Sequence, residues 1–256
     1  MKLFAWAAVP LFGAPLVFGS DVTMQEATIA ATLATGANIE HLQQRVDGME
    51  KKAIANGSFT DDDKRFLRDL YGAMALGAKK SVVLRQSGLM MDRYLERSGR
   101  DLELDPAIFS KNAKVRAQTK KLAAQLSSSS TPRTVRSPRF YMPDASSFDS
   151  ITGLYWGTVE ASVRIKADGS RVLHYRAEVP WEWPSYESLR KKYGTPHAET
   201  FLLPNLRSVV GGPRYALHIE NGLGEYLVRL GLAKPFVAWA QWDERDEPTT
   251  SADEPL

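Results

Sequence analysis

The stretch RIKADGSRVLHYRAEVPWEW, Arg164–Trp183, predicts the turn and second strand of a β-hairpin. Apolar and polar residues alternate on both sides of its ADGS segment, which is the period of two of a half-buried strand. A two-residue turn would mix apolar and polar residues on both faces, whereas a three-residue loop at 168–170 leaves one face apolar. We therefore predict that loop, with a core face made of Ile165, Val163, Leu173, Tyr175 and Val179 and with Trp181 opposite Gly157.

The other face of the predicted hairpin is charged. In this register His174 lies opposite Arg164 and points outward, and Glu160 lies opposite Glu178. Two facing carboxylates could share a proton or hold a metal, because like charges so close raise one pKa. Alternatively, Arg176 lies between them on a solvated face, where such cross-strand pairs contribute only about 0.2–1 kcal/mol. We favour the solvated face and predict no metal site.

The residues before the hairpin have the period of an α-helix, with apolar residues three and four apart from Ile39 to Ala53 and again from Phe66 to Met74. Ser58 or Thr60 is a predicted cap, and Asp105-Pro106 is a helix-start signal. The period predicts helices over about 39–55, 60–74, 81–95, 105–126, 185–193 and 223–230, and further strands over 215–220 and 235–242.

The predicted fold class is α+β, an N-terminal helical bundle followed by a small antiparallel-sheet α+β domain. The serine- and proline-rich segment 127–147 has the composition of a linker. The predicted division is a signal peptide at 1–19, a helical domain at 20–126, the linker at 127–147, an α+β domain at 148–243 and an acidic disordered tail at 244–256.

The N-terminal segment predicts export. Lys2 is followed by an uncharged apolar run to Gly19, which is short for a membrane span and is interrupted by Pro10 and Pro15. We expect cleavage near Gly19 and a secreted or periplasmic protein, with a retained anchor as the alternative. The chain has no cysteine, which excludes disulfides, thiolate metal sites and a cysteine nucleophile, and fits a bacterial envelope protein.

The chain has four histidines, of which His41 is predicted to be a surface residue and the other three are candidates for acid–base or metal chemistry. His197 and Glu199 share a predicted loop, and His218 and Glu220 alternate on one face of a predicted strand. A zinc site made of His174, His197 and His218 is conceivable, but no local ligand pair supports it. An envelope hydrolase would draw its catalytic residues from His197, Glu199, His218, Glu220 and Glu178.

Residues 106–143 contain basic residues but no acidic one, although the net charge of the chain is only +3. This segment could contact anionic lipid, lipopolysaccharide or the acidic tail; a solvated helix face with a linker is the plainer interpretation, and nucleic acid is not expected. Trp183, near the end of a strand, is a further candidate for contact with a partner. The candidate binding residues are Trp183, Arg176, Lys111, Lys114, Lys120, Lys121, Arg133 and Arg136.

Two runs, LMMDRYLERSGRDLELDPAIF (89–109) and GEYLVRLGLAKPFVAWAQW (224–242), resemble segments of uncharacterised secreted bacterial proteins found near polymorphic toxins. This resemblance carries no catalytic motif and implies only a bacterial exported protein.

The chain also lacks a serine-nucleophile elbow, a phosphate-binding glycine loop and a dinucleotide fingerprint, so we expect no cofactor. The leading hypothesis is a non-enzymatic exported protein that binds a protein or envelope component in inter-bacterial or host interaction. The alternatives are the envelope hydrolase and a membrane-active toxin built on the helical half. In that toxin, small residues would permit close helix packing, namely Gly72, Ala73, Ala75, Gly77 and Ala78.

Overall fold

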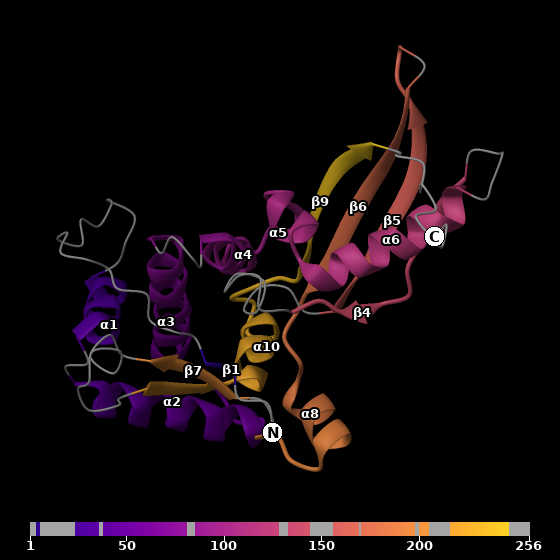
Figure 1. The fold of residues 1–256 in the computed structure, drawn as a ribbon. Helices are drawn as coiled ribbons and strands as arrows, with labels where there is room; N and C mark the ends of the chain where they lie inside the picture. The colour runs from indigo at the N-terminus through magenta and orange to yellow at the C-terminus, as the bar shows by residue number, and fades with distance from the viewer. Residues whose placement is uncertain are drawn as a thin grey trace, which may run out of the picture. The chain divides into compact units, whose positions relative to one another are not determined.

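The computed structural model describes residues 4–5, 24–35, 38–80, 85–127, 133–143, 156–168, 170–197, 200–204 and 216–245. These residues form helices and two sheets, so the fold class is α+β, as the sequence predicts (Figure 1). The chain forms two compact units: unit 1 comprises residues 1–102 and 180–237, and unit 2 comprises residues 103–179 and 238–256.

These units differ from the predicted domain division. The predicted helical domain, 20–126, contributes residues to both units, and residues 180–237 belong with the N-terminal helices in unit 1. A contiguous division assumes that each domain is one continuous segment, whereas each unit here combines two separate segments of the chain. Of the predicted signal peptide only Phe4–Ala5 is described, and of the predicted tail only Glu244 and Arg245. No helix in the described ranges has the length and apolar character needed to cross a bilayer.

Unit 1 contains a small sheet with strand order β1-β7-β8, in which β1 is parallel to β7 and β7 is antiparallel to β8. Helix α2 packs against β8 and α10 (Figure 1). The elements of this unit are β1 (Phe4–Ala5), α1 (Met24–Thr35), α2 (Ile39–Ile54), α3 (Asp61–Lys80), α4 (Arg85–Leu95), α8 (Tyr186–Tyr193), β7 (Thr200–Pro204), β8 (Ala216–Glu220) and α10 (Asn221–Arg229).

The apolar stripes predicted for α2 and α3 are buried in unit 1, including Val46 and Leu70. Of the two predicted caps for α3, the structure uses Thr60. Its hydroxyl accepts a hydrogen bond from Asp63 N at 3.2 Å, and the Asp63 carboxylate accepts one from Thr60 N at 2.9 Å. This reciprocal capping box satisfies two backbone donors at the start of the helix.

Small residues bring α4 onto α3. A Cβ atom at Gly88 would lie 2.4 Å from the backbone nitrogen of Lys79, so only glycine permits this approach. Ala75 and Ala78 of α3 are buried. The small residues that the toxin hypothesis assigned to membrane helices therefore include positions that pack within this unit.

The elements of unit 2 form one sheet with a helix on it. The strand order is β2-β9-β6-β5-β3, and β4 also pairs with β5. Helix α6 contacts β5 and β3 (Figure 1). The elements are β2 (Leu102–Glu103), α5 (Ala107–Ser110), α6 (Ala113–Ser127), β3 (Thr134–Arg136), β4 (Phe140–Tyr141), β5 (Trp156–Ile165), β6 (Arg171–Trp181) and β9 (Phe236–Arg245), of which β2, β6 and β9 cross the boundary between the units.

The described part of the predicted linker, 133–143, forms strands β3 and β4. Val135 pairs with Ala161, and Phe140 pairs with Gly157, both in antiparallel register. A segment whose composition cannot build a core is ordered here because β5 offers it a hydrogen-bonding edge. Composition alone does not predict that a strand such as β5 is available for pairing.

The hairpin β5–β6 forms as predicted, but its register differs. Val163 pairs with Leu173 and Ala161 with Tyr175, whereas the predicted partner of Val163 was Tyr175. Lys166 N donates to Ser170 O at 2.9 Å, so Ser170 takes part in the pairing of the strands and does not belong to the predicted loop. The slip of two residues leaves each side chain on its predicted face, because the side-chain period of a strand is two. The core face is correct for residues such as Tyr175, which is buried.

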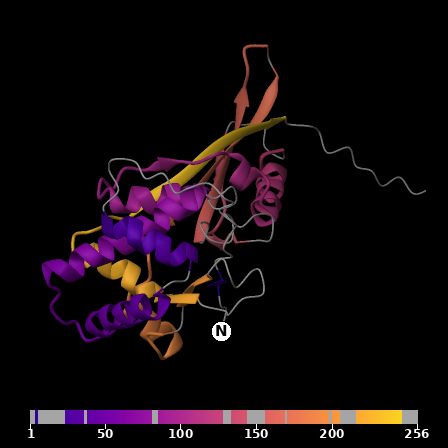
Figure 2. The same ribbon diagram turned by 90° about the vertical axis from the view of Figure 1, so that its left-hand side faces the viewer.

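Two details of the predicted hairpin are wrong. Ile165 is 70% exposed, because the tip of the hairpin extends beyond the end of β9 (Figures 1 and 2). Trp181 does not cover Gly157; a Cβ atom at Gly157 would instead lie 2.6 Å from Met142 Cε and 2.9 Å from a Val179 methyl group. Trp181 itself is buried, as predicted.

Candidate functional site

Glu50 is a buried carboxyl group on the apolar stripe of α2. It follows Val46 by four residues and precedes Ala53 by three, so the helix turns it inward. Its side chain accepts a hydrogen bond from the backbone nitrogen of Glu220 at 2.7 Å, at the junction of β8 and α10. Burial, together with the nearby carboxylates of Glu220 and Asp47, raises the pKa of Glu50 to about 8, although the hydrogen bond from Glu220 N acts to lower it.

Glu220 joins this group to a histidine. Its Oε1 atom pairs with His197 Nδ1, while its Oε2 atom is buried without a hydrogen-bond partner among the described residues. The side chain of Glu220 is 12% exposed and that of His197 is 57% exposed. One residue therefore contacts a buried acid through its backbone and a solvent-facing imidazole through its side chain.

Two tyrosines complete the buried cluster. Burial raises the pKa of Tyr186, and the charges of Glu50 and Glu220 raise it further. The pKa of Tyr71 is raised for the same reasons, burial and then Glu50. Neither hydroxyl has a hydrogen-bond partner among the described residues. Buried polar groups are usually satisfied, so this cluster has hydrogen-bonding capacity that the described residues do not use.

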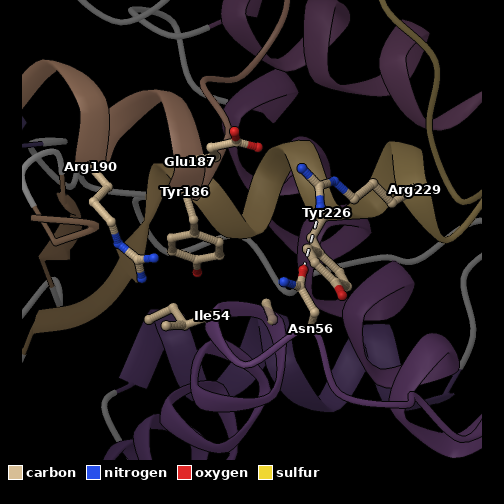
Figure 3. A pocket seen from close by; sticks show the side chains of 8 residues that line it. Ile54, Asn56, Tyr186, Glu187, Arg190, Tyr226 and Arg229 are labelled. Carbon is tan, nitrogen blue, oxygen red and sulfur yellow. Dashed lines mark hydrogen bonds between the residues drawn. The ribbon is translucent and has the colours of Figure 1, made fainter.

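A pocket of about 280 Å³ adjoins the cluster where α2, α8 and α10 meet (Figure 3). Tyr186 belongs both to the buried cluster and to the lining of the pocket. Glu50 lies one helical turn before Ala53 and Ile54, the α2 residues that line the pocket. The lining residues are Ala53, Ile54, Asn56, Tyr186, Glu187, Arg190, Tyr226 and Arg229.

Two arginines lie on opposite sides of the rings of Tyr186 and Tyr226 (Figure 3). Arg229 donates to Glu225 at 3.0 Å, so its charge is already partnered. Arg190 has no ion pair within the described residues. A guanidinium group without a counter-ion at a pocket wall can bind a carboxylate or phosphate through two parallel hydrogen bonds.

Glycines on α10 allow the aromatic side chains to approach. A Cβ atom at Gly222 would lie 2.4 Å from the ring of Tyr186, and one at Gly224 would lie 2.4 Å from the ring of Trp183. The Ser185 hydroxyl caps α8 by accepting a hydrogen bond from Ser188 N at 3.1 Å, which sets the helix that carries Tyr186. The spacing Gly-x-Gly at the start of the helix predicted over 223–230 is the sequence signal that could have indicated this packing.

Trp183, predicted as a candidate for partner contact, is half-buried. Its ring lies edge-on to Trp181, with centroids 5.8 Å apart, and edge-on to Tyr71, at 6.3 Å. It therefore contributes to packing within unit 1. The sequence places it near a strand end but does not show that α10 covers it.

Of the predicted catalytic residues, the structure brings together His197 and Glu220. Glu199 lies outside the described residues. His218 has an exposed side chain; its backbone bonds reciprocally to the side chain of Gln43, with N–H···Oε1 at 2.7 Å and Nε2–H···O at 3.0 Å. Within the described ranges, no group of three or more His, Asp or Glu side chains is arranged to hold a metal ion.

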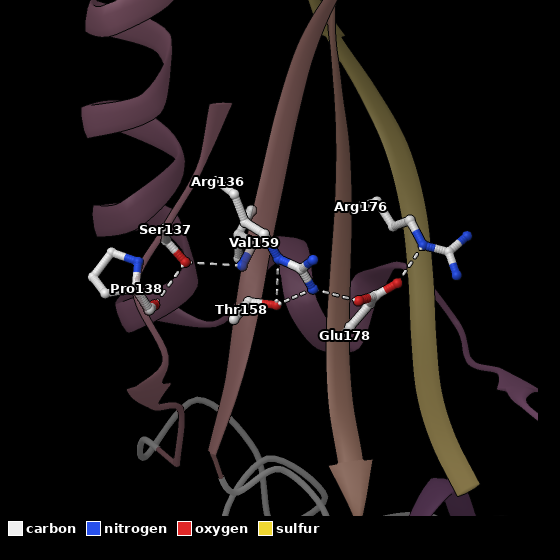
Figure 4. Close-up of polar contacts among 7 residues, drawn as sticks. All are labelled: Arg136, Ser137, Pro138, Thr158, Val159, Arg176 and Glu178. Atoms are coloured by element: carbon white, nitrogen blue, oxygen red, sulfur yellow. Dashed lines mark hydrogen bonds and ion pairs between the residues drawn. The ribbon is translucent and has the colours of Figure 1, made fainter. Parts of the chain in front are cut away.

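Glu178 belongs to unit 2, where it lies between two arginines. It accepts from Arg136 Nη2 at 2.6 Å and from Arg176 Nε at 2.8 Å (Figure 4). Its cross-strand partner is Thr158, and that of Glu160 on β6 is Arg176, so the predicted pair of facing carboxylates is wrong. The two-residue slip of the register separates them, and two cations balance the charge of Glu178.

His174 is buried, contrary to the predicted outward position between arginines. Its Nδ1 atom lies 2.7 Å from the carboxylate of Asp243 on β9. The alternation of β6 correctly assigns His174 to the face opposite the core. It does not show that β9 pairs beside β6 and supplies an acidic partner there.

The predicted basic residues occupy different environments in unit 2. Arg176 lies over the ring of Trp239 at 4.2 Å, and Lys114 over that of Tyr141 at 4.9 Å. Arg133 donates to the backbone oxygen of Gln125 near the end of α6. The lysines at 111, 120 and 121 are exposed.

The cluster in unit 1 and the pocket beside it contain groups suited to two functions, which are proton transfer and the binding of an anion. A histidine oriented by a carboxylate can accept a proton, and a carboxyl group with a pKa near 8 can donate one at neutral pH. The adjoining pocket offers a guanidinium group beside aromatic rings, which suits an anion with an apolar body.

Comparisons with known proteins do not assign a family. No protein-family model, curated protein or solved structure matches this chain.

Proposed function

We propose that this chain is an exported bacterial binding protein whose unit 1 pocket holds a small organic anion. The observation that carries the proposal is Arg190, which lines the pocket without an ion-pair partner among the described residues. The rings of Tyr186 and Tyr226 offer apolar faces beside it. Export rests on the apolar N-terminal segment, and N-terminal sequencing of the mature protein from a bacterial periplasm tests it.

The size and lining of the pocket limit the ligand. A volume of about 280 Å³ is at the lower end for small-molecule sites, so the ligand is no larger than a substituted ring. Glu187 and Asn56 can accept hydrogen bonds from hydroxyl or amino groups. The chemical class is therefore a ring that carries a carboxylate or phosphate, to which a hydroxyl or amino donor can add further hydrogen bonds.

Three probes separate the contributions of charge and ring. Benzoate carries both, benzyl alcohol carries the ring without the charge, and acetate carries the charge without the ring. We expect benzoate to raise the melting temperature of the full chain by about 3 °C at ten times its Kd, since such binding contributes about 1.4 kcal/mol. The other two probes should have smaller effects.

The matched variants are Arg190→Gln and Lys191→Gln. Both remove one positive charge from α8, but only Arg190 lines the pocket. Loss of the benzoate effect in the first variant alone supports the proposal. An unchanged benzoate effect in Arg190→Gln, or no effect of benzoate on the wild type, contradicts it.

A second candidate is an envelope hydrolase, favoured by the pairing of His197 with Glu220 beside Glu50. In this candidate His197 activates water and protonated Glu50 supplies a proton. Purified peptidoglycan is the probe, and released fragments are measured by mass spectrometry. His197→Gln should lower the rate at least about 100-fold, whereas His41→Gln, an exposed histidine on α2, should not. Absence of fragments with the wild type removes this candidate.

A further inference from the structure

Helix α6 in unit 2 has two contrasting faces. Its apolar residues, including Val115, Leu122 and Leu126, are buried. The opposite face is exposed, and its centre contains small and basic side chains. These residues are Ala113, Arg116, Ala117, Lys120, Lys121 and Ala124, which we call the basic α6 face.

The arrangement follows from helical geometry. At about 100° per residue, the three alanines of this face fall within about 40° of one another and form a flat strip along the helix. Arg116 and Lys120 lie on one side of the strip, and Lys121 lies on the other. The cations can therefore reach one plane without a bulky side chain between them.

The charge of this face is not balanced locally. Arg116, Lys120 and Lys121 have no ion pair within the described residues. The segment 106–143 contains eight basic residues and no acidic one. Arg133 adds another charge at the end of α6, where it donates to the backbone of Gln125.

We propose that the basic α6 face docks on an anionic phospholipid surface. A flat strip flanked by cations matches a bilayer plane, and lysines near such a surface attract its headgroups as point charges. The face has no aromatic side chain on which a nucleic-acid base could stack. The apolar side of α6 is already buried, so the attraction is electrostatic, reversible and weakened by salt. This inference does not depend on the unit 1 pocket.

The test is co-sedimentation of the full chain with vesicles. We expect binding to vesicles of equal phosphatidylglycerol and phosphatidylcholine in about 0.1 M NaCl, little binding to phosphatidylcholine alone, and release in about 0.5 M NaCl. The triple variant Arg116→Gln, Lys120→Gln, Lys121→Gln should lose about 100-fold in apparent affinity. Ala117→Glu, which places an acid in the centre of the strip and keeps a good helix former, should also weaken binding.

The matched control is Lys51→Gln, Arg68→Gln, Lys191→Gln. It removes the same number of charges from exposed positions of α2, α3 and α8. Equal loss in both triple variants would show attraction by net charge alone and would overturn the proposal. Failure of the wild type to bind the anionic vesicles would also overturn it, as would tighter binding to a single-stranded oligonucleotide that depends on the same three residues. Circular dichroism of each variant confirms that α6 remains folded.

Discussion

Glu50 in unit 1 and Glu178 in unit 2 are both inward or half-buried carboxyl groups, but their surroundings are opposite. Glu178 lies between the guanidinium groups of Arg136 and Arg176, at 2.6 and 2.8 Å. Glu50 has no cationic partner among the described residues, and burial raises its pKa to about 8. A carboxylate with two cations stabilises its sheet, whereas a buried acid without one disfavours its own ionised form. The second arrangement is typical of functional sites.

The largest expected effect comes from Glu50→Gln. Because the folded state holds the proton of Glu50 up to about pH 8 and the unfolded state releases it near 4.5, the folded state binds more protons between these values. The free energy of unfolding of the wild type therefore falls as pH rises through this window. The glutamine amide removes this loss, and its oxygen still accepts the hydrogen bond from Glu220 N. We expect a gain of about 3–5 kcal/mol at pH 8 and little at pH 5.

Urea denaturation at pH 5, 6, 7 and 8 measures this difference. Parallel pH profiles for the wild type and the variant would show that Glu50 does not ionise differently in the folded state.

The next effect comes from Gly222→Ala, which tests the packing around the buried cluster. The added Cβ would lie 2.4 Å from the Tyr186 ring, so the ring or α10 must move. We expect a loss of about 1–3 kcal/mol in the free energy of unfolding. Gly48→Ala on α2 is the control, since nothing lies within 4 Å of its Cβ position; there alanine should stabilise by about 0.5–1 kcal/mol. Equal effects of the two changes on thermal unfolding would contradict the close contact.

The smallest effect comes from Glu178→Gln, and its sign is opposite to that of Glu50→Gln. Glu178 and both of its arginine partners are partly exposed, so solvent screens the pairs. We expect a loss of about 1 kcal/mol at pH 8, which becomes smaller in about 0.5 M NaCl. A gain in stability on this substitution, measured by urea denaturation, would remove the contrast between the two glutamates.

Part of the site could have been found in the sequence. Glu50 falls on the apolar stripe of α2, between Val46 and Ala53, and an acid at such a position is unusual enough to mark it. His197 and Glu220 were both predicted as catalytic candidates, but in separate pairs. Their contact joins a loop to the end of β8 across more than twenty residues, and no local pattern encodes it. Arg190 resembles its neighbours in the basic run RKK of α8 and carries no sequence signal at all.

The sequence by itself determined the elements that depend on neighbouring residues. The end of α2 follows from Asn56, the start of α3 from its Thr60 cap, and both ends of α8 from Ser185 and Gly194. The core face of the hairpin follows from alternation, which survives a two-residue slip. Only the tertiary structure decided which cross-strand partners meet and that residues 180–237 join the N-terminal helices. It also decided that Glu50 lacks a cationic partner among the described residues, whereas Glu178 has two. These features depend on packing between segments distant in the chain, which local periodicity does not specify.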